Sequence, residues 1–576
     1  MAAMLALASI TYAADVAPDS QGMNMTAHEW CRNVVMGWNL GNALESAGAR
    51  WDDESGTWKD IYISDYNEWE TGWNNPKTTK AMIQAVKKEG FNAVRVPVRW
   101  VPHITNYVDM TIDPVWMARV KEVIDWCLEE DLMVVVNTHH ELWLESHPFY
   151  KEQETLNRKL RALWKNIATS FRDYDERLVF SGTNEVTYHW NAPTKENLDV
   201  QNSFNQAFVD AVRETGGKNY YRNLVVQTFA CDPSYGLSGF VVPTDKVENR
   251  LSVEFHYYSP YSYCSGTEGS YYYWGKAYQD KGTITPDGDE KALQTLFTQI
   301  RKKWWEQGLG VVLGEYGVAH HYTVADKNVQ EENEGYYLQC VVTEARKNGF
   351  AAFVWDNNAF GNGSEYFGIF DRRTGMTVRT PWFLNGIKEG AKTEYSEENN
   401  DPEQIDWGAG GTVFWEGNSR LNWGNGLQLK IPATAFSDYQ DQVLVVIYYD
   451  QDGTTSYEDI QFCDGNWKGL SFSVEESEKT GDFSPRDYYG YSSDNRITPI
   501  LFKEDAFKSI RKGGLIIQGY GIILKKIVFT DSPTTSITSP FYNKASVRLY
   551  NLYGNTVANP IEGRIYIKNG QKILWK

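Results

Sequence analysis

Two glutamates stand at the ends of short apolar runs, where a buried carboxylate needs a chemical reason. Glu185 follows the run 178–183 and Asn184, and Glu315 follows the run 311–314. A carboxylate at the tip of a buried strand is costly to desolvate unless a partner pairs with it or a reaction uses it. Two such groups on converging strands can serve as the acid and the nucleophile that cleave a sugar acetal. The pattern therefore predicts a glycosidase-type carboxylate pair.

The elements that must position these glutamates alternate between apolar runs and amphipathic segments. The runs, which suit parallel strands buried on both faces, are 34–37, 93–96, 132–136, 178–180, 224–226, 251–255, 311–313 and 351–354. The segments with helical periodicity are 77–90, 114–131, 155–171, 202–216, 290–307 and 333–348. Eight such units predict an α/β fold, a (β/α)8 TIM barrel over residues 25–390. A doubly wound sheet is the alternative, but the Gly-rich phosphate turn it often carries is not visible.

Polar and aromatic side chains follow nearly every predicted strand. They are Asn39, Asn42, Arg95, His139, His140, Asn184, Glu185, His256, Tyr258, Glu315 and Trp355. Each has an adequate structural explanation on its own, since a lone histidine is often a hydrogen-bonded core residue and an arginine can be a buried ion-pair partner. In barrel enzymes, however, the carboxyl ends of the strands form the active site. The fact that all of these residues fall at strand ends favours a functional site.

These motifs also resemble a known family. The segments 37–42, 94–97, 138–141, 184–185, 256–258, 314–317 and 353–355 are similar to glycoside hydrolase family 5, over about residues 30–390. The stretch 70–79 is similar to the endoglucanase and xyloglucanase branch of that family. The resemblance departs at one position, where Val186 replaces the proline that usually follows Asn-Glu.

The resemblance implies a role for each residue. Glu185 would be the general acid/base and Glu315 the nucleophile, while Asn184 would bond the 2-hydroxyl of the reacting sugar. Arg95 and Tyr258 would hold Glu315 ionised. The residues expected to bind substrate are Asn39, Asn42, Arg95, His139, His140, Asn184, His256, Tyr258 and Trp355, with Trp355 as the floor under the reacting sugar.

Elementary electrostatics agrees with this division of labour. Two nearby carboxylates push their pKa values apart, so that one keeps its proton and the other its charge. Arg95 and Tyr258 favour the charge on Glu315, whereas Glu185 has only Asn184 beside it in the sequence. No metal or other cofactor is expected. His139 and His140 are adjacent and lack a third ligand at helical spacing, and the spacing at 450–453 favours a hairpin over a calcium loop.

Composition narrows the class of protein. The 576 residues carry 56 Lys+Arg and 75 Asp+Glu, a net charge of -19, with no basic stripe, which argues against nucleic acid as a partner. No apolar run reaches about 18 residues, so no membrane span is expected after the N-terminus. The 22 Trp and 36 Tyr fit either large cores or platforms for sugar rings, and their frequency in predicted loops favours platforms. The six scattered cysteines are expected to be isolated thiols.

The rest of the chain divides into segments that differ in composition and in hydrophobic pattern. Residues 1–14 have the apolar run and small residues of a signal peptide, without the basic residues that usually precede them. A polar linker is predicted at 391–406, a β-sandwich at 407–530 with one helix at 503–512, and a second linker at 531–540. The sandwich tryptophans are core residues or the surface of a carbohydrate-binding module: Trp407, Trp415, Trp423 and Trp467.

The last segment, 541–576, resembles the C-terminal sorting tail of secreted Bacteroidetes proteins. That resemblance implies outer-membrane secretion machinery as a partner and a secreted or cell-surface location.

From all of these features we expect a secreted, retaining endo-β-1,4-glucanase that acts on cellulose, mixed-linkage glucan or xyloglucan. A β-mannanase would share the same catalytic set. A non-catalytic polysaccharide-binding protein is the alternative from another class, and the intact Glu185 and Glu315 argue against it.

Overall fold

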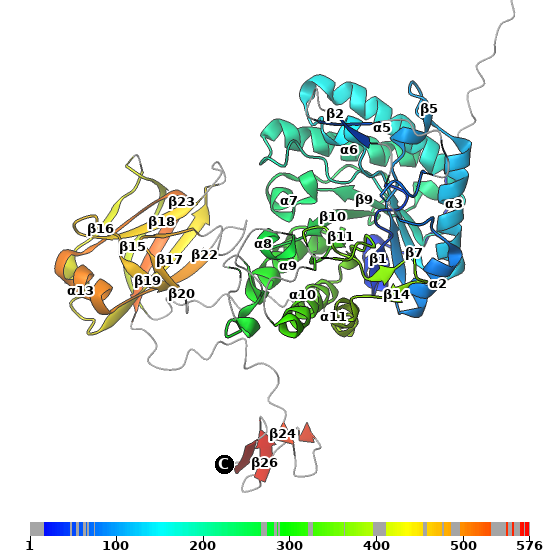
Figure 1. Cartoon of the computed structure of the whole chain (residues 1–576). Coiled ribbons are helices and arrows are strands. Elements are labelled where there is room, and N and C mark those ends of the chain that lie inside the picture. Colours follow the sequence, from blue (N-terminus) through cyan, green and yellow to red (C-terminus); the bar gives the residue numbers. More distant parts are fainter. Residues whose placement is uncertain are drawn as a thin grey trace, which may run out of the picture. The chain divides into compact units, whose positions relative to one another are not determined.

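The chain forms two compact units, one built from the chain up to Asn399 and the other from most of the chain after it. Figure 1 shows the elements of both. The computed structural model describes residues 16–46, 49–52, 57–60, 65, 68–73, 75–265, 273–281, 285, 288–320, 326–361, 363–395, 411–424, 426–452, 458–474, 477–484 and 496–530, and four short strands after residue 548. The predicted signal peptide and second linker, like Trp407, lie outside the described residues.

The first unit is the predicted TIM barrel. Eight parallel strands close in the order β1-β12-β11-β10-β9-β8-β7-β4. Their bounds are β1 Gly37–Asn39, β4 Ala93–Val96, β7 Met133–Asn137, β8 Leu178–Ser181, β9 Leu224–Gln227, β10 Leu251–Tyr257, β11 Gly310–Tyr316 and β12 Ala351–Val354. Every residue of these strands is buried, which explains why they read as continuous apolar runs.

Helices surround the barrel, as Figure 1 shows. They are α1 Ala27–Asn33, α2 Lys80–Lys88, α3 Pro114–Glu129, α4 Leu142–Glu145, α5 Tyr150–Ser170, α6 Lys195–Glu214, α7 Pro233–Gly239, α8 Tyr261–Cys264, α9 Glu290–Lys303, α10 Lys327–Lys347 and α11 Pro381–Ala391. Local chemistry sets their starts. The Thr79 side chain caps α2, and Asp113 caps α3 with Pro114 in its first turn. Three two-stranded sheets decorate the unit: β2 Ala49–Asp52 with β3 Thr57–Asp60, β5 Ile104–Asn106 with β6 Thr111–Ile112, and β13 Phe370–Asp371 with β14 Thr377–Val378.

The sequence prediction is wrong at two edges of this unit. The first strand is not 34–37 but begins at Gly37, because the main-chain N–H groups of Val35 and Met36 are bonded to the Asn92 side chain instead of a neighbouring strand. The expected linker does not begin at 391. Tyr395 still packs on the barrel, with its hydroxyl 3.2 Å from Trp305 Nε1.

The second unit is an antiparallel sheet of nine strands. They are β15 Thr412–Asn422, β16 Leu429–Ile431, β17 Gln442–Gln451, β18 Asp459–Asp464, β19 Ser471–Val474, β20 Ser477–Thr480, β21 Asp482–Phe483, β22 Arg496–Lys503 and β23 Leu515–Thr530, with helix α13 Glu504–Gly513 near the predicted place. The segments 514–518 and 522–529, which are each strand-like in sequence, form one strand, β23. Its first part pairs with β16 and β18, and its second part pairs mainly with β15 and β17.

The chain ends in a separate small sheet. It contains β24 Leu549–Tyr550, β25 Thr556–Val557, β26 Ile565–Lys568 and β27 Gln571–Leu574. Within the part of the chain that the structure describes, no helix has both the length and the apolar character that crossing a bilayer requires.

Candidate active site

Glu315 reaches the site through an irregularity in its strand. Along β10 and β11, Phe255 pairs with Leu313 but His256 pairs with Glu315, so Gly314 is an extra residue on β11. Such a bulge re-aims the side chain that follows it and is frequent beside active sites. The Glu315 side chain is 7% exposed. It thus lies at the end of β11, turned over the end of β10.

Glu315 has the two partners that the sequence predicts. Arg95 Nη1 donates to its Oε1 at 2.9 Å, and the Tyr258 hydroxyl donates to its Oε2 at 3.0 Å. Burial raises the pKa of Glu315, and His256 and Arg95 only partly offset this, so the pKa lies above its usual value. These contacts orient one carboxylate oxygen toward Arg95 and the other toward Tyr258.

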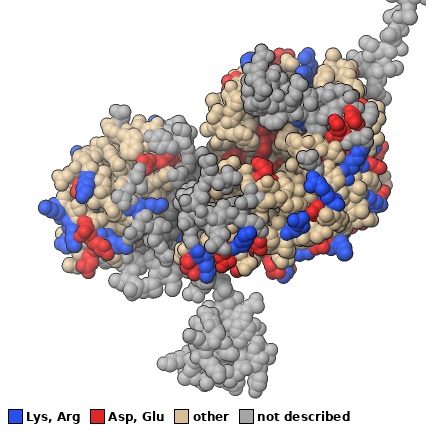
Figure 2. All heavy atoms as spheres, viewed as in Figure 1, with Lys and Arg blue, Asp and Glu red and all other residues tan. Residues whose placement is uncertain are grey.

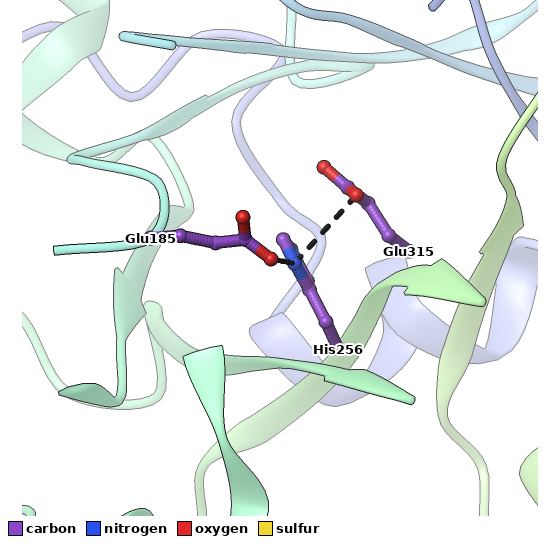
Figure 3. Close-up of side chains that lie close together, drawn as sticks. All are labelled: Glu185, His256 and Glu315. Atoms are coloured by element: carbon purple, nitrogen blue, oxygen red, sulfur yellow. Dashed lines mark hydrogen bonds and ion pairs between the residues drawn. The ribbon is translucent and has the colours of Figure 1, made fainter. Parts of the chain in front are cut away.

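Glu185 lies across the site and has a partner that the sequence does not reveal. His256 Nδ1 is 2.7 Å from Glu185 Oε1 and 3.7 Å from Glu315 Oε2. Figure 3 shows the His256 side chain reaching between the two carboxylates, each of which comes from a different side. Burial disfavours charge on this ring, but the Cys231 sulfur and the carboxylates of Glu315 and Glu185 hold the pKa of His256 well above its usual value.

The spacing of these three side chains limits their chemistry. One ligand atom from each of Glu185, His256 and Glu315 lies within 4.8 Å of the other two. Such a trio could hold a metal ion. The same spacing suits a pair of carboxylates flanking a glycosidic bond, which need no metal: about 5–5.5 Å separates them in retaining enzymes and about 6.5–9.5 Å in inverting ones.

Arg95 bonds to several polar side chains at the centre of the barrel. Its guanidinium contacts Asn39 Oδ1 at 3.0 Å, Asn184 Oδ1 at 2.8 Å and Glu254 Oε1 at 3.0 Å, besides Glu315. Because the Asn184 oxygen is bound to Arg95, its amide nitrogen is the group left to face a sugar hydroxyl. Asn39 is fully buried and also donates to the main-chain oxygen of Gly314, so its described contacts position Arg95 and β11.

A row of rings runs along one side of the site. Trp355 and His139 are parallel with centroids 5.9 Å apart, His140 contacts His139 edge-on at 4.3 Å, and Trp73 contacts His140 edge-on at 5.5 Å. Burial lowers the pKa of His139 well below its usual value and that of His140 to about 4, so both rings are neutral near pH 7. Trp73 is 42% exposed and extends the row outward.

The structure thus brings most of the predicted residues together. Asn42 is the exception, because its described hydrogen bonds are made by its main chain. Its backbone is left-handed, with φ 56°, and its main-chain atoms contact Glu45 and Asn75, so its described hydrogen bonds shape the loop after β1. Three site neighbours were missed: Glu254, Cys231 and Trp73. Glu254 carried a signal, since it is the one charged residue in the apolar run 251–255 and lies two positions before His256, on the same face of the strand.

The geometry agrees with what known proteins show. A family model, cellulase (glycosyl hydrolase family 5), matches residues 53–361. Endoglucanase A of Clostridium longisporum is 33% identical over 65% of this chain and 68% of its own length. A solved Bacteroides ovatus xyloglucanase bound to a XXXG heptasaccharide has TM-score 0.59 and 32% identity over 66% of this chain and 80% of that chain.

A solved lichenase mutant from a Caldicellulosiruptor species, bound to cellotetraose, has TM-score 0.56 and 30% identity over 64% of this chain and 96% of that chain. The family model alone spans more than half of the sequence. The chain belongs to glycoside hydrolase family 5, the cellulase family, and is a glycoside hydrolase.

Proposed function

We propose that this protein is a retaining endo-β-1,4-glucanase that hydrolyses cellulose, mixed-linkage β-glucan or xyloglucan. The observation that carries the proposal is that one carboxylate oxygen of Glu185 lies within 4.8 Å of one of Glu315, with Arg95 and Tyr258 bonded to Glu315. The relatives named above are an endoglucanase, a xyloglucanase and a lichenase, which supports a β-glucan backbone as substrate.

The reaction then follows in two displacements. Glu315 attacks the anomeric carbon while Glu185 gives its proton to the leaving oxygen, which produces a glycosyl ester on Glu315 and releases one part of the chain. Glu185 next removes a proton from water, and the water oxygen attacks the same carbon and frees Glu315. Two inversions leave the anomeric configuration unchanged.

We infer that the aromatic side chains contact the substrate on both sides of the bond that is cleaved. The row Trp355, His139, His140 and Trp73 follows the reacting sugar on the side of β12 and β7. The leaving part of the chain then lies over the loops after β8 to β10. There Trp190, only five residues beyond Glu185, is 68% exposed and left-handed with φ 56°. A bulky residue held in that strained region next to a site suggests a functional constraint.

The experiment that tests the proposed function is a substrate panel. The full chain should release reducing sugar from carboxymethyl-cellulose, mixed-linkage glucan or xyloglucan, and the first product seen by NMR should be the β anomer. Glu315→Ala should abolish the release. Activity on mannan alone would make the enzyme a β-mannanase. Binding of β-glucan without hydrolysis would make it a non-catalytic binding protein.

For the second unit we propose a role in holding the enzyme on polymer. Trp467 is 45% exposed with φ 66°, and Trp423 is half-buried with φ 42°, so two turns of the sheet present indole rings. Exposed rings of this kind suit the apolar faces of sugars. We also propose that the protein is secreted or displayed at the cell surface, as the signal-like start and the sorting-like tail suggest. Fractionation of cells with and without residues 541–576 tests this.

A further inference from the structure

Beneath the catalytic pair, Glu254 on β10 is a fully buried carboxylate that the reaction above does not use. Its Oε1 lies 3.0 Å from Arg95 Nη2 and 3.4 Å from His256 Nε2. Its Oε2 accepts from the Ser181 hydroxyl at 2.6 Å and from Gln227 Nε2 at 2.8 Å. One oxygen therefore faces two basic groups, while the other is held by neutral donors from β8 and β9.

The neighbouring strand leaves room for this carboxylate. A Cβ at position 314 would lie 1.9 Å from Glu254 Oε1, which no side chain could accommodate. Gly314 is also the extra residue of the bulge that aims Glu315. The strand that carries the nucleophile is thus shaped around the Glu254 carboxylate, so Glu254 is an integrated part of the site and not a stray buried charge.

Arg95 divides its charge between two carboxylates. Burial opposes the guanidinium charge, but Glu254 and then Glu315 raise the pKa of Arg95 above its usual value. When Glu315 becomes a glycosyl ester, it loses its negative charge. Without Glu254, Arg95 would then be a buried cation with no counter-charge, which is a costly state.

We propose that Glu254 is a positioning residue that acts through Arg95 as its permanent counter-charge, and thereby assists the attack of Glu315 on the sugar. This inference rests on the proposed two-step hydrolysis. An Arg95 paired only with Glu315 would stabilise the carboxylate before attack and resist its conversion to an ester. Glu254 reduces that resistance. In the second step the ester is hydrolysed and Glu315 regains its charge, so the loss of Glu254 would not slow that step.

The titratable and charged groups around Glu254 allow the pH behaviour to be assigned. Arg95 faces it from β4, His256 from its own strand, Cys231 from the turn after β9, and Glu315 lies beyond Arg95 on β11. Burial opposes its charge, but Arg95 and His256 hold the pKa of Glu254 at about 2, so it stays ionised. Burial raises the pKa of the Cys231 thiol to about 12, so the thiol stays neutral. Neither group changes charge between pH 4 and 8.

The decisive experiment compares Glu254→Gln with the wild-type chain on two β-cellobiosides. One carries a dinitrophenyl group, whose easy departure makes ester hydrolysis limiting, and the other an alkyl group, whose slow departure makes attack by Glu315 limiting. The variant should lose about tenfold or more in kcat on the alkyl glycoside, the rate equivalent of one pKa unit, and little on the aryl glycoside. Glu254→Gln also removes a negative charge near Glu315, so the pKa of Glu315 should fall. The acidic limb of kcat/KM should then move down by about one pH unit.

A second variant at position 254 and one control variant complete the test. Glu254→Asp retains the negative charge and should keep the acidic limb of kcat/KM at its wild-type pH. If Glu254→Gln folds poorly, this variant still tests whether a charge at position 254 sets that limb. Glu458→Gln removes a buried, ion-paired carboxylate from the second unit, where Arg496 Nη1 is 2.6 Å away, and should change neither profile. Equal losses on both glycosides with an unmoved limb would overturn the proposal and leave Glu254 a packing role. A wild-type chain inactive on every β-glucan and cellobioside would instead refute the proposed function.

Discussion

His256 Nδ1 lies 2.7 Å from Glu185 Oε1, so the proposed acid/base has a buried basic neighbour. The sequence places these residues 71 positions apart and gives no reason to pair them. The pKa of His256 is held well above its usual value, so the ring is a proton-carrying neighbour of Glu185. The histidine supplies a second site for the proton that the leaving group needs.

Tyr258→Phe should move the acidic limb of kcat/KM to higher pH. The Tyr258 hydroxyl bonds Glu315 Oε2 at 3.0 Å and so favours the ionised form. Burial already places the pKa of Glu315 above its usual value, and loss of this bond raises it further. Because attack requires ionised Glu315, the limb should rise by about one pH unit. The pH dependence of cellobioside hydrolysis measures it. Tyr261→Phe, at a tyrosine that is 69% exposed, is the control, and an unmoved limb in Tyr258→Phe would contradict the role of this bond.

Glu185→Gln should slow natural substrates far more than activated ones. A dinitrophenyl leaving group needs no proton, so the first step should survive, while attack by water on the ester should be slow without a base. Azide needs no base and should restore turnover and give a β-glycosyl azide. If azide neither accelerates the variant nor forms that product, another carboxylate is the acid/base. Glu145, a buried glutamate on α4, is the control, since Glu145→Gln should show no azide rescue.

Sequence alone predicts the barrel well because its signals are local. Buried parallel strands read as apolar runs, and the strand ends gather polar residues in any fold of this type. The predicted strand at 93–96 coincides with β4, and the predicted helix at 114–131 differs from α3 only at its end. The carboxyl ends of the strands then bring Arg95, Glu185 and Glu315 together without any long-range information.

What sequence does not predict depends on register and on distance between strands. The bulge at Gly314 sets the direction of the Glu315 side chain. A glycine within an apolar run is not enough to predict such a bulge from the sequence. Glu254 becomes interpretable only when Arg95, from another strand, is seen 3.0 Å away. Strand β23 looks like two strands because Gly519 and Gly521 interrupt its apolar pattern, although its pairing continues past them.

Trp73→Ala and Trp190→Ala should act on opposite sides of the bond that is cleaved. Trp73 extends the ring row of the reacting sugar, so its loss should raise KM for aryl cellobiosides and for oligosaccharides alike. Trp190 follows Glu185 on the leaving side, so its loss should spare aryl cellobiosides and weaken the hydrolysis of cellotetraose and cellopentaose. Loss of a stacked ring should cost about tenfold in kcat/KM. Equal effects of Trp190→Ala on both substrate types would refute its placement.

A chain ending at residue 395 should hydrolyse soluble β-glucan at the full rate and act more weakly on insoluble cellulose. The cut follows Tyr395, which packs on Trp305, so the barrel keeps this contact, and the two units are compact in their own right. Hydrolysis of soluble glucan checks the fold, and pull-down on cellulose measures binding. In the full chain, Trp467→Ala should reproduce part of the binding loss without affecting soluble substrate, because its ring is exposed and far in sequence from the catalytic residues. If the shortened chain binds cellulose as well as the full chain does, the second unit has another role. If it does not fold, that unit is a structural partner of the barrel.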